Sequence, residues 1–444
     1  MLFNSIDFLF YFFLIYSLYR IIKPVHRVIF ILLVSLIFYG WTNFSFIFIL
    51  ILNGLVDYFL AILIVKHRKY AKYLLTLSVV TNVLFLVFFK YKLKYFTDLF
   101  FFVPIGISFY TFQSMSYTID IYKKKTPLCL NIFNYLAYLS FFPQLIAGPI
   151  ERSIVLISQF SDIKNKEIKI SIKYIQLIIL GFFKKMVISD NLISAVEGAF
   201  FGGHIVDNSL FWWIISGICI IHVYCDFSGY CDIAQGIAGI FGIELSLNFN
   251  NPLLSTTFSE FWKRWHISLS SWIRDYVYIP LKGDRNIAVV HVLLIAFVFA
   301  LVGLWHGARI SFIIFGLTFA FFYLIEFYII KKILKRIKLV GYFYVMLGLS
   351  LAMISFWSKS FSQYRAIIET MFSLSGKEFF QFTSLNYFSL SMFLILYFYN
   401  FIVYKYQIKI SDFNIVKNYF FSIVLIVFII FFRGEGRTFV YFQF

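Results

Sequence analysis

Long apolar runs recur from one end of the chain to the other, and they constrain its fold more than any other feature. Of the 444 residues, 61% are hydrophobic and only 14% are charged, and Phe alone occurs 62 times. A typical soluble domain carries about 25% charged residues. A bilayer core requires segments of about 20 apolar residues whose backbone polar groups are bonded internally. The sequence therefore predicts an all-α polytopic membrane protein.

The apolar runs define the candidate spans 5–22, 27–40, 44–65, 73–89, 99–120, 132–147, 171–189, 209–240, 287–304, 309–330, 340–357, 386–404 and 418–432. We expect about eleven true crossings, with the other segments re-entrant or interfacial. Two runs contain Pro and Gly near their middles, in "VPIGISFYTFQS" (99–120) and "FFPQLIAGPIERS" (132–147). Irregular backbone at membrane depth survives only where it is buried in protein or lines a cavity. We therefore predict that both segments are broken and lie beside an internal cavity.

The distribution of basic residues indicates orientation. The clusters at 66–72 and 331–338 are the strongest candidates for cytoplasmic loops. The cluster at 90–94 conflicts with the one at 66–72, because the two flank one short span, so the topology of that region stays open. From residue 331 onward the alternation of loops places the C-terminal tail outside. No internal repeat or linker is visible, and we predict one membrane domain over 1–444, with 418–444 as its terminal span and aromatic tail.

The net charge of +18 would suggest nucleic acid as a partner of a soluble protein. Here the Lys and Arg residues lie between hydrophobic segments, where they orient helices, so we expect no nucleic acid partner. The four cysteines form no CxxC pair and are expected to be small buried apolar side chains: Cys129, Cys219, Cys225 and Cys231. Segment 5–22 lacks a basic n-region and a cleavage site, which is typical of a retained helix rather than a signal peptide.

The stretch 260–281, "EFWKRWHISLSSWIRDYVYIPL", concentrates charges, indoles and an imidazole. Helical spacing relates Phe261, Trp265, Leu269, Trp272 and Tyr276. The sequence thus predicts one helix here, capped by a residue of 255–257, with Glu260 in its first turn. Other positions carry the charges Lys263, Arg264, Arg274 and Asp275. Such a helix lies at an interface or lines a polar cavity, and ionisable groups at membrane depth indicate a site.

Two histidines stand beside tryptophans in polar breaks. His266 follows Trp265, and His306 ends an uncharged apolar run in "ALVGLWHGARIS", between Trp305 and Gly307. A neutral imidazole in such surroundings can take a proton from a hydroxyl, and Gly307 would leave room for a substrate. The alternative is that both are hydrogen-bonded structural residues. Both interpretations stay open on the local sequence; in the catalytic one His306 is a general base and Trp305 and Trp265 line the site.

A metal site is the competing chemical interpretation. His222, Asp226 and Asp232 fall in one segment, "HVYCDFSGYCDIAQG", but neither His266 nor His306 has a third ligand in a pattern such as HExxH. We therefore assign no metal. Asp226 and Asp232 are candidates for orienting backbone or histidine groups inside the helix bundle, and Asp226 is also a candidate for lining the substrate tunnel. The sequence contains no Gly-rich phosphate loop, GxSxG elbow or Cys-His nucleophile pattern.

An ordered series of blocks resembles the membrane-bound O-acyltransferase (MBOAT) family, above all the bacterial branch of alginate and peptidoglycan O-acetyltransferases. The similar blocks are "VPIGISFYTFQSMSYTIDIYK", "FFPQLIAGPIERS", "YCDFSGYCDIAQG", "EFWKRWHISLSSWIRDYVYIPL" and "GLWHGA". The resemblance covers most of the chain. It implies a ring of helices around a thin central floor, with a tunnel that brings a cytoplasmic acyl donor to an acceptor on the far side.

The same resemblance implies roles for single residues and for partners. His306 matches the family's catalytic histidine and His266 its second histidine. The implied donor is acetyl-CoA, with no bound cofactor, and the implied partner is an extracytoplasmic serine esterase-like acetyltransferase. The chain would lie among the lipids of the bacterial cytoplasmic (inner) membrane. In this interpretation Lys263, Arg264 and Arg274 attract the phosphates of CoA, or only set the depth of their helix.

The tail "FVYFQF" resembles the end of this branch and also a small companion of the teichoic-acid D-alanyltransferase. We predict that 418–444 acts as a built-in companion in which Tyr441 carries the acyl group, with an aromatic interfacial anchor as the alternative. D-alanyl transfer, a transporter or flippase, and a non-catalytic scaffold of a polysaccharide export complex stay open as other functions. The acceptor stays open too: alginate, peptidoglycan or another exopolysaccharide.

Overall fold

The computed structural model describes residues 1, 3–91, 104–167, 171–281, 287–376, 378, 381–405, 415–437 and 439. Regular structure in this part of the chain is helical, and its one strand-like feature is an isolated antiparallel bridge between Asn208 and Gly376. The predicted all-α class is confirmed. The chain divides into two compact units: unit 1 is Met1–Ile178 with Cys231–Leu247, and unit 2 is Ile179–Tyr230 with Asn248–Phe444.

Seven segments of the described residues are helical, long and apolar enough to cross a membrane: Ser45–Lys66, Arg68–Lys90, Ser209–Ile240, Ala288–His306, Ile310–Leu334, Lys338–Trp357 and Ser384–Ile402. Two shorter apolar helical segments, Pro24–Gly40 and Tyr419–Phe432, accompany them. Each of these segments overlaps a span predicted from the sequence, as a multi-pass membrane protein requires. The count of about eleven crossings remains a prediction.

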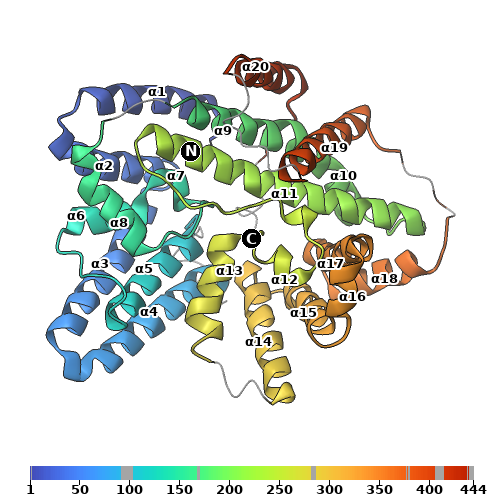
Figure 1. Cartoon of the computed structure of the whole chain (residues 1–444), viewed down its shortest axis with the longest axis horizontal. Coiled ribbons are helices and arrows are strands. Elements are labelled where there is room, and N and C mark those ends of the chain that lie inside the picture. The colour runs from blue at the N-terminus through green and yellow to red at the C-terminus, as the bar shows by residue number, and fades with distance from the viewer. Residues whose placement is uncertain are drawn as a thin grey trace. The chain divides into compact units, whose positions relative to one another are not determined.

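Unit 1 contains α1 (Ile6–Ile21), α2 (Arg27–Gly40), α3 (Ser45–Lys66), α4 (Ala71–Tyr91), α5 (Ile107–Tyr122), α6 (Ile132–Ser140), α7 (Phe142–Leu145) and α8 (Ser153–Asp162). Helices α3, α4 and α5 pack side by side (Figure 1). Between them the buried carboxylate of Asp57 accepts hydrogen bonds from Ser78 Oγ at 2.6 Å, Asn82 Nδ2 at 2.7 Å and Ser114 Oγ at 2.5 Å. A buried carboxylate needs such donors, so this cluster ties the three helices together.

The second of the two segments expected to be broken is broken, and in the first the described helix begins only at Ile107. Gly106 precedes α5 with φ +74°, and a Cβ there would lie 2.4 Å from the backbone oxygen of Leu145. In the second segment α6 ends at Ser140, and Pro143 stands in the first turn of α7, where its missing N–H does no harm. Residues 99–103 lie outside the described residues. The two segments therefore meet at Gly106, and the cavity expected beside them remains a prediction.

Unit 2 contains η4 (Phe183–Ser189), α10 (Asp190–Phe201), α12 (Phe258–Phe261), α13 (Ile267–Ile273), η6 (Arg274–Tyr278), α14 (Ala288–His306), α15 (Ile310–Ile325), η7 (Glu326–Ile330), α16 (Lys331–Arg336), α17 (Lys338–Trp357), α18 (Phe361–Phe372), α19 (Ser384–Lys405) and α20 (Ile415–Phe432). Helix α9 (Ile172–Phe182) and the long helix α11 (Ser209–Ile240) contribute residues to both units. Helix α15 packs against both α14 and α17 (Figure 1).

Two glycines allow α14 and α15 to cross at backbone contact. A Cβ on Gly303 would lie 2.1 Å from the backbone oxygen of Phe312, and a Cβ on Gly316 would lie 2.0 Å from the backbone oxygen of Phe299. Small residues permit such close approach at membrane helix interfaces. Because Gly303 is one turn from the end of α14, this crossing fixes the place of His306.

The single helix predicted over Phe261–Tyr276 is wrong. Helix α12 ends at Phe261, the chain turns, and α13 begins at Ile267, with His266 between them at φ +43°. The predicted cap is confirmed, since the hydroxyl of Thr257 accepts a hydrogen bond from the backbone N–H of Glu260. The aromatic spacing of the sequence is real, but it spans two short helices rather than one.

The cause of this break lies in a distant segment of the chain. The backbone N–H of Asn250 donates to the oxygen of Arg264 at 2.9 Å, and the N–H of Ile267 donates to the oxygen of Asn248 at 3.0 Å. These long-range partners satisfy backbone groups that would otherwise be bonded within a helix. Periodicity within 260–281 cannot reveal them.

Replacing Gly303 by Ala should loosen the α14–α15 crossing. The added Cβ meets backbone rather than a flexible side chain, so the helices must separate, at a cost of about 1–3 kcal/mol. We expect a lower melting temperature of the detergent-solubilised protein. Gly217→Ala in α11 is the matched control, because a Cβ there meets no atom within 4 Å. Equal melting temperatures for the two variants would contradict the close crossing.

Candidate active site

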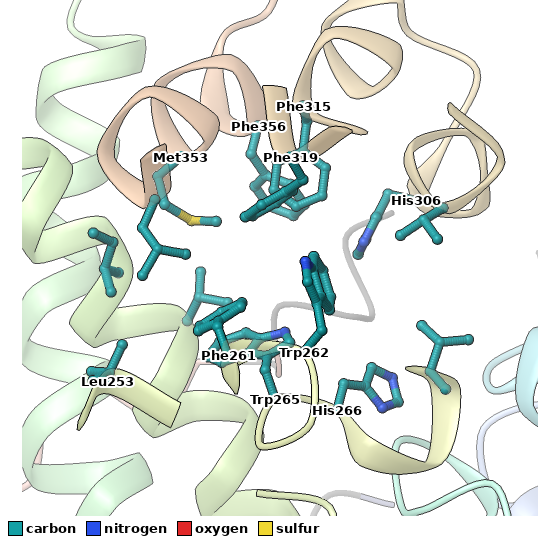
Figure 2. A pocket seen from close by; sticks show the side chains of 15 residues that line it. Leu253, Phe261, Trp262, Trp265, His266, His306, Phe315, Phe319, Met353 and Phe356 are labelled. Atoms are coloured by element: carbon teal, nitrogen blue, oxygen red, sulfur yellow. The ribbon is translucent and has the colours of Figure 1, made fainter. Parts of the chain in front are cut away.

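A cavity of about 40 Å³ lies in unit 2. Its lining consists of Ile220, Val223, Leu253, Phe261, Trp262, Trp265, His266, Leu269, Val302, His306, Phe315, Phe319, Leu349, Met353 and Phe356. Figure 2 shows the two histidines along one side of the cavity, with Trp262 reaching into its middle. Ligand sites are typically enclosed by apolar side chains with a few placed polar groups. The structure thus brings His266 and His306 to one cavity, and their catalytic role remains a prediction.

His306 is the last residue of α14, and its ring is buried among aromatic side chains. The ring centroid lies 4.8 Å from that of Trp305 and 5.3 Å from those of Phe315 and Phe356. The expectation that Gly307 leaves room for a substrate is wrong, because a Cβ there would lie 2.7 Å from the ring of Phe312. The space beside Gly307 is taken by that ring, and the packed aromatic groups hold the imidazole at the wall of the cavity.

Asn248 fixes the tautomer of His266. Its side-chain oxygen accepts the backbone N–H of Ser268 at 3.1 Å and the hydroxyl of Ser268 at 2.9 Å, and His266 Nδ1 lies 3.2 Å from the same oxygen. A backbone N–H can only donate, so the shared atom is the amide oxygen rather than the nitrogen. His266 Nδ1 therefore carries the proton and Nε2 does not, because a neutral imidazole has one donor and one acceptor nitrogen.

His266 is also held in its neutral form. The side chain is 2% exposed, and burial lowers the pKa of His266 to about 3. The cause is the loss of solvation that the charged ring would need. At neutral pH the Nε2 lone pair is therefore available as a hydrogen-bond acceptor or as a base.

Of the two tryptophans predicted to line the site, Trp265 lines the cavity and Trp305 does not. The Trp305 ring lies beside both imidazoles, with centroid distances of 6.0 Å to His266 and 4.8 Å to His306. Trp265 lines the cavity itself. Its ring stacks on Phe261 with centroids 5.4 Å apart, which anchors it to α12.

The predicted basic residues lie elsewhere. Lys263 and Arg274 are exposed, and neither they nor Arg264 line the cavity. The Arg264 guanidinium donates to the Glu260 carboxylate at 2.7 Å, and that of Arg274 lies 2.8 Å from Asp275. The contact of Arg274 lies at the surface, where such pairs contribute little stability. The cavity-lining residues therefore include neither Lys nor Arg.

Asp226 is separate from the cavity and belongs to a buried ion cluster. Its carboxylate lies 2.6 Å from the ammonium of Lys185, which also lies 2.8 Å from Asp190. The C-terminal segment packs on this cluster, because the ring centroid of Phe439 lies 4.5 Å from Lys185 Nζ and 4.7 Å from the Tyr230 ring. Phe439 is buried, at 1% exposure. Tyr441, the predicted acyl carrier, lies outside the described residues.

The metal interpretation finds no support in the residues that the structure describes. No group of three or more His, Cys, Asp or Glu side chains there could hold a metal ion. His222 Nδ1 instead lies 2.9 Å from the hydroxyl of Ser189, and Asp226 pairs with Lys185. All four cysteines are buried, as expected.

Sequence reasoning missed Glu326, which holds the start of α12. Its buried carboxylate accepts the backbone N–H of Phe258 at 2.5 Å and the hydroxyl of Ser259 at 2.5 Å. A carboxylate favours the N-terminal end of a helix, and this one ties the turn that bears His266 to the end of α15. A signal was present, because Glu326 is the only acidic residue in the apolar run 309–330, and buried charges require partners.

The sequence matches the MBOAT, membrane-bound O-acyltransferase, family over residues 123–357. A probable alginate O-acetylase (AlgI) of Pseudomonas aeruginosa is 34% identical over 71% of this chain and 64% of its own length. A peptidoglycan O-acetyltransferase of Helicobacter pylori is 34% identical over 66% of this chain and 63% of its own length. A teichoic acid D-alanyltransferase of Bacillus subtilis is 31% identical over 49% of this chain and 57% of its own length.

The match to more than half of the chain settles its class: the protein belongs to the membrane-bound O-acyltransferase family. The histidines at the cavity lie within the matched residues, at positions 266 and 306. The chain spans somewhat less than two thirds of the length of the P. aeruginosa and H. pylori relatives.

The tautomer of His266 can be measured by NMR of detergent-solubilised protein with ¹⁵N-labelled histidine. We expect a protonated Nδ1 and an unprotonated Nε2 from about pH 8 down to about pH 5, because a pKa lowered to about 3 keeps the ring neutral over that range. The signal is assigned by its loss in His266→Asn. Asn248→Leu should release the ring to the other tautomer. A ring that takes up a proton near its ordinary pKa would contradict the burial described above.

Proposed function

We propose that the chain is a membrane O-acetyltransferase, which takes acetyl from cytoplasmic acetyl-CoA and passes it across the membrane for O-acetylation of an extracytoplasmic polysaccharide. The observation that carries this proposal is the small cavity walled by both histidines. Membership of the family supports acyl transfer, and the names of the alginate and peptidoglycan relatives support acetyl and a polysaccharide. Peptidoglycan, alginate and another exopolysaccharide all fit the proposal.

In the proposed mechanism His306 is the general base. Its imidazole takes the proton of the acceptor hydroxyl as the oxygen attacks the carbonyl carbon of the thioester. The carbon–sulfur bond then breaks, and the imidazolium returns its proton to the departing CoA thiolate, so that atoms and charge balance. A positioned base of this kind contributes about 10²–10⁴-fold in rate. His266 positions the reacting groups through the lone pair on Nε2.

The size and polarity of the cavity favour acetyl over D-alanyl as the transferred group. One water needs about 10–15 Å³ by this measure, so a cavity of about 40 Å³ suits a group with two carbons and one oxygen. A D-alanyl group adds a methyl and an ammonium, and a buried ammonium requires a carboxylate or other acceptors. The lining contains neither Asp nor Glu. These features support the acetyl donor.

The acetyl group would cross the membrane within the chain. The chain would sit in the bacterial cytoplasmic membrane, with its helices in a ring around a thin floor and a tunnel through it. The exposed side chains of Lys263 and Arg274 would attract the phosphates of CoA. The acceptor hydroxyl would belong to Tyr441, to the sugar polymer, or to a serine of an extracytoplasmic esterase-like partner that completes the transfer.

The packing of the C-terminal segment supports a built-in carrier. The backbone N–H of Gly434 donates to the backbone oxygen of Met186 at 2.8 Å, and Asn191 Nδ2 donates to the backbone oxygen of Phe432 at 2.9 Å. Two residues before Tyr441, the side chain of Phe439 is buried in unit 2. An aromatic interfacial anchor would instead face lipid headgroups. We therefore propose that Tyr441 receives the acetyl group and offers it to the next protein.

His306→Ala should abolish acetyl transfer by the purified protein supplied with radiolabelled acetyl-CoA. The base is lost, so we expect a rate lower by about 10²–10⁴-fold with a normal amount of protein in the membrane. His291→Ala is the control, because it removes another buried imidazole of α14 that binds Tyr328 outside the cavity. Transfer that persists in His306→Ala would remove this histidine from the mechanism. Turnover of a D-alanyl donor, or of none, would contradict the function itself.

Tyr441→Phe distinguishes the role of acyl carrier from that of aromatic anchor, because it deletes the hydroxyl and keeps the aromatic ring. We expect the polymer to lose its O-acetyl groups, as measured by mass spectrometry of cell-wall and secreted glycans. Tyr419→Phe makes the same change at an exposed position of α20 and should leave acetylation unchanged. Normal acetylation in both variants would show that the acetyl group does not pass through Tyr441.

A further inference from the structure

The proposed acetyl transfer requires a hydrogen-bond donor that the histidines do not supply. As the hydroxyl oxygen attacks, the carbonyl oxygen of the thioester gains negative charge, and enzymes stabilise it with preorganised donors. His306 is occupied as the base. His266 is neutral with its proton on Nδ1, which faces Asn248. Its Nε2 therefore accepts rather than donates, and the donor must come from another group.

Apart from the histidines, the nitrogen atoms in the side chains that line the cavity belong to Trp262 and Trp265. The side chains of the other lining residues are aliphatic, Phe or Met and offer no N–H or O–H. Donation to a carbonyl oxygen held inside the cavity thus falls to an indole.

Trp262 is the indole whose N–H is placed for this purpose. Its Nε1 is buried and has no hydrogen-bond acceptor among the residues that the structure describes. A buried Trp N–H usually finds a partner, and leaving one unsatisfied costs about 1–3 kcal/mol. Figure 2 shows the Trp262 side chain reaching into the middle of the cavity, between His306 and the phenylalanine rings. An acceptor atom bound there would satisfy the N–H.

The Trp262 ring is held firmly in this position. Its centroid lies 4.9 Å from the Phe319 ring, 5.4 Å from Phe299 and 5.4 Å from Phe261. These rings come from α15, α14 and α12, so the indole is clamped between the α14–α15 pair and the turn that bears His266. A donor that does not reorganise during the reaction stabilises developing charge most effectively.

We propose that Trp262 is a catalytic residue whose Nε1–H donates a hydrogen bond to the carbonyl oxygen of the bound acetyl thioester and, more strongly, to the oxyanion of the tetrahedral intermediate. The inference rests on the proposed acetyl transfer. The carbonyl electron pair moves to this oxygen when the new carbon–oxygen bond forms, and it returns when the carbon–sulfur bond breaks. The indole keeps its proton throughout.

Trp262→Phe tests the inference, because it removes the N–H and keeps an aromatic ring. Loss of one oxyanion donor lowers kcat by about 10²–10³-fold, and we expect this with nearly unchanged affinity for acetyl-CoA and an unchanged pH profile of kcat. A second variant guards against a packing defect: 3-benzothienylalanine at position 262 keeps the bicyclic shape and replaces N–H by sulfur. It should lose kcat to the same extent at the wild-type melting temperature.

Trp213→Phe is the control, since it deletes an indole N–H that donates to Met371 outside the cavity and should leave kcat unchanged. If the kcat of the benzothienyl variant is within a few-fold of the wild-type value, Trp262 is not the donor. Trp262 is also not the donor if kcat, acetyl-CoA affinity and melting temperature all fall together in both Trp262 variants. Either result leaves the acetyltransferase function standing, provided that the wild type transfers acetyl and His306→Ala does not. A wild type without acetyl transfer would overturn the function and the inference together.

Discussion

The position of His266 depends on a short backbone pairing between 248–250 and 264–267. Two backbone hydrogen bonds join these segments, and the Asn248 side chain adds contacts to His266 and Ser268. The pairing ends the helix that local spacing favours and holds His266 at φ +43°. A non-glycine residue in this region is strained by about 1–3 kcal/mol. Strain of this kind persists only where surrounding contacts fix it, and here they also fix which ring nitrogen carries the proton.

The wall of the cavity that carries His306 depends on another contact, the close crossing of α14 and α15 at Gly303 and Gly316. Glu326 connects this helix pair to the turn that carries His266. It follows α15, and its carboxylate accepts a hydrogen bond from the backbone that starts α12. The turn that carries His266 is therefore tied to the helix pair that carries His306. A shift of either wall would change the space between the imidazoles, which is why buried polar contacts outside the cavity matter for its chemistry.

Much of this fold could be predicted from the sequence, and the failures have one physical origin. Apolar runs of bilayer length marked the helices, and α2 and α11 begin and end where the runs predicted. The sequence also singled out the two histidines that line the cavity. Local patterns could not show the break at 262–266, because its cause is pairing with 248–250. Nor could they place Asp226 with Lys185 instead of at the cavity, since that contact joins residues 41 positions apart.

The apolar lining of the cavity gives its few polar groups their effect. Hydrogen bonds and charges act more strongly where water is excluded, and exclusion of water also protects a thioester from hydrolysis. A volume of about 40 Å³ accommodates an acetyl group but neither the rest of CoA nor a sugar. The reacting carbon would therefore be held inside while donor and acceptor remain largely outside, meeting it from the edges of the cavity. In the proposed reaction, selectivity for acetyl would follow from what the apolar walls exclude, and reactivity would follow from the imidazoles and the indole that they surround.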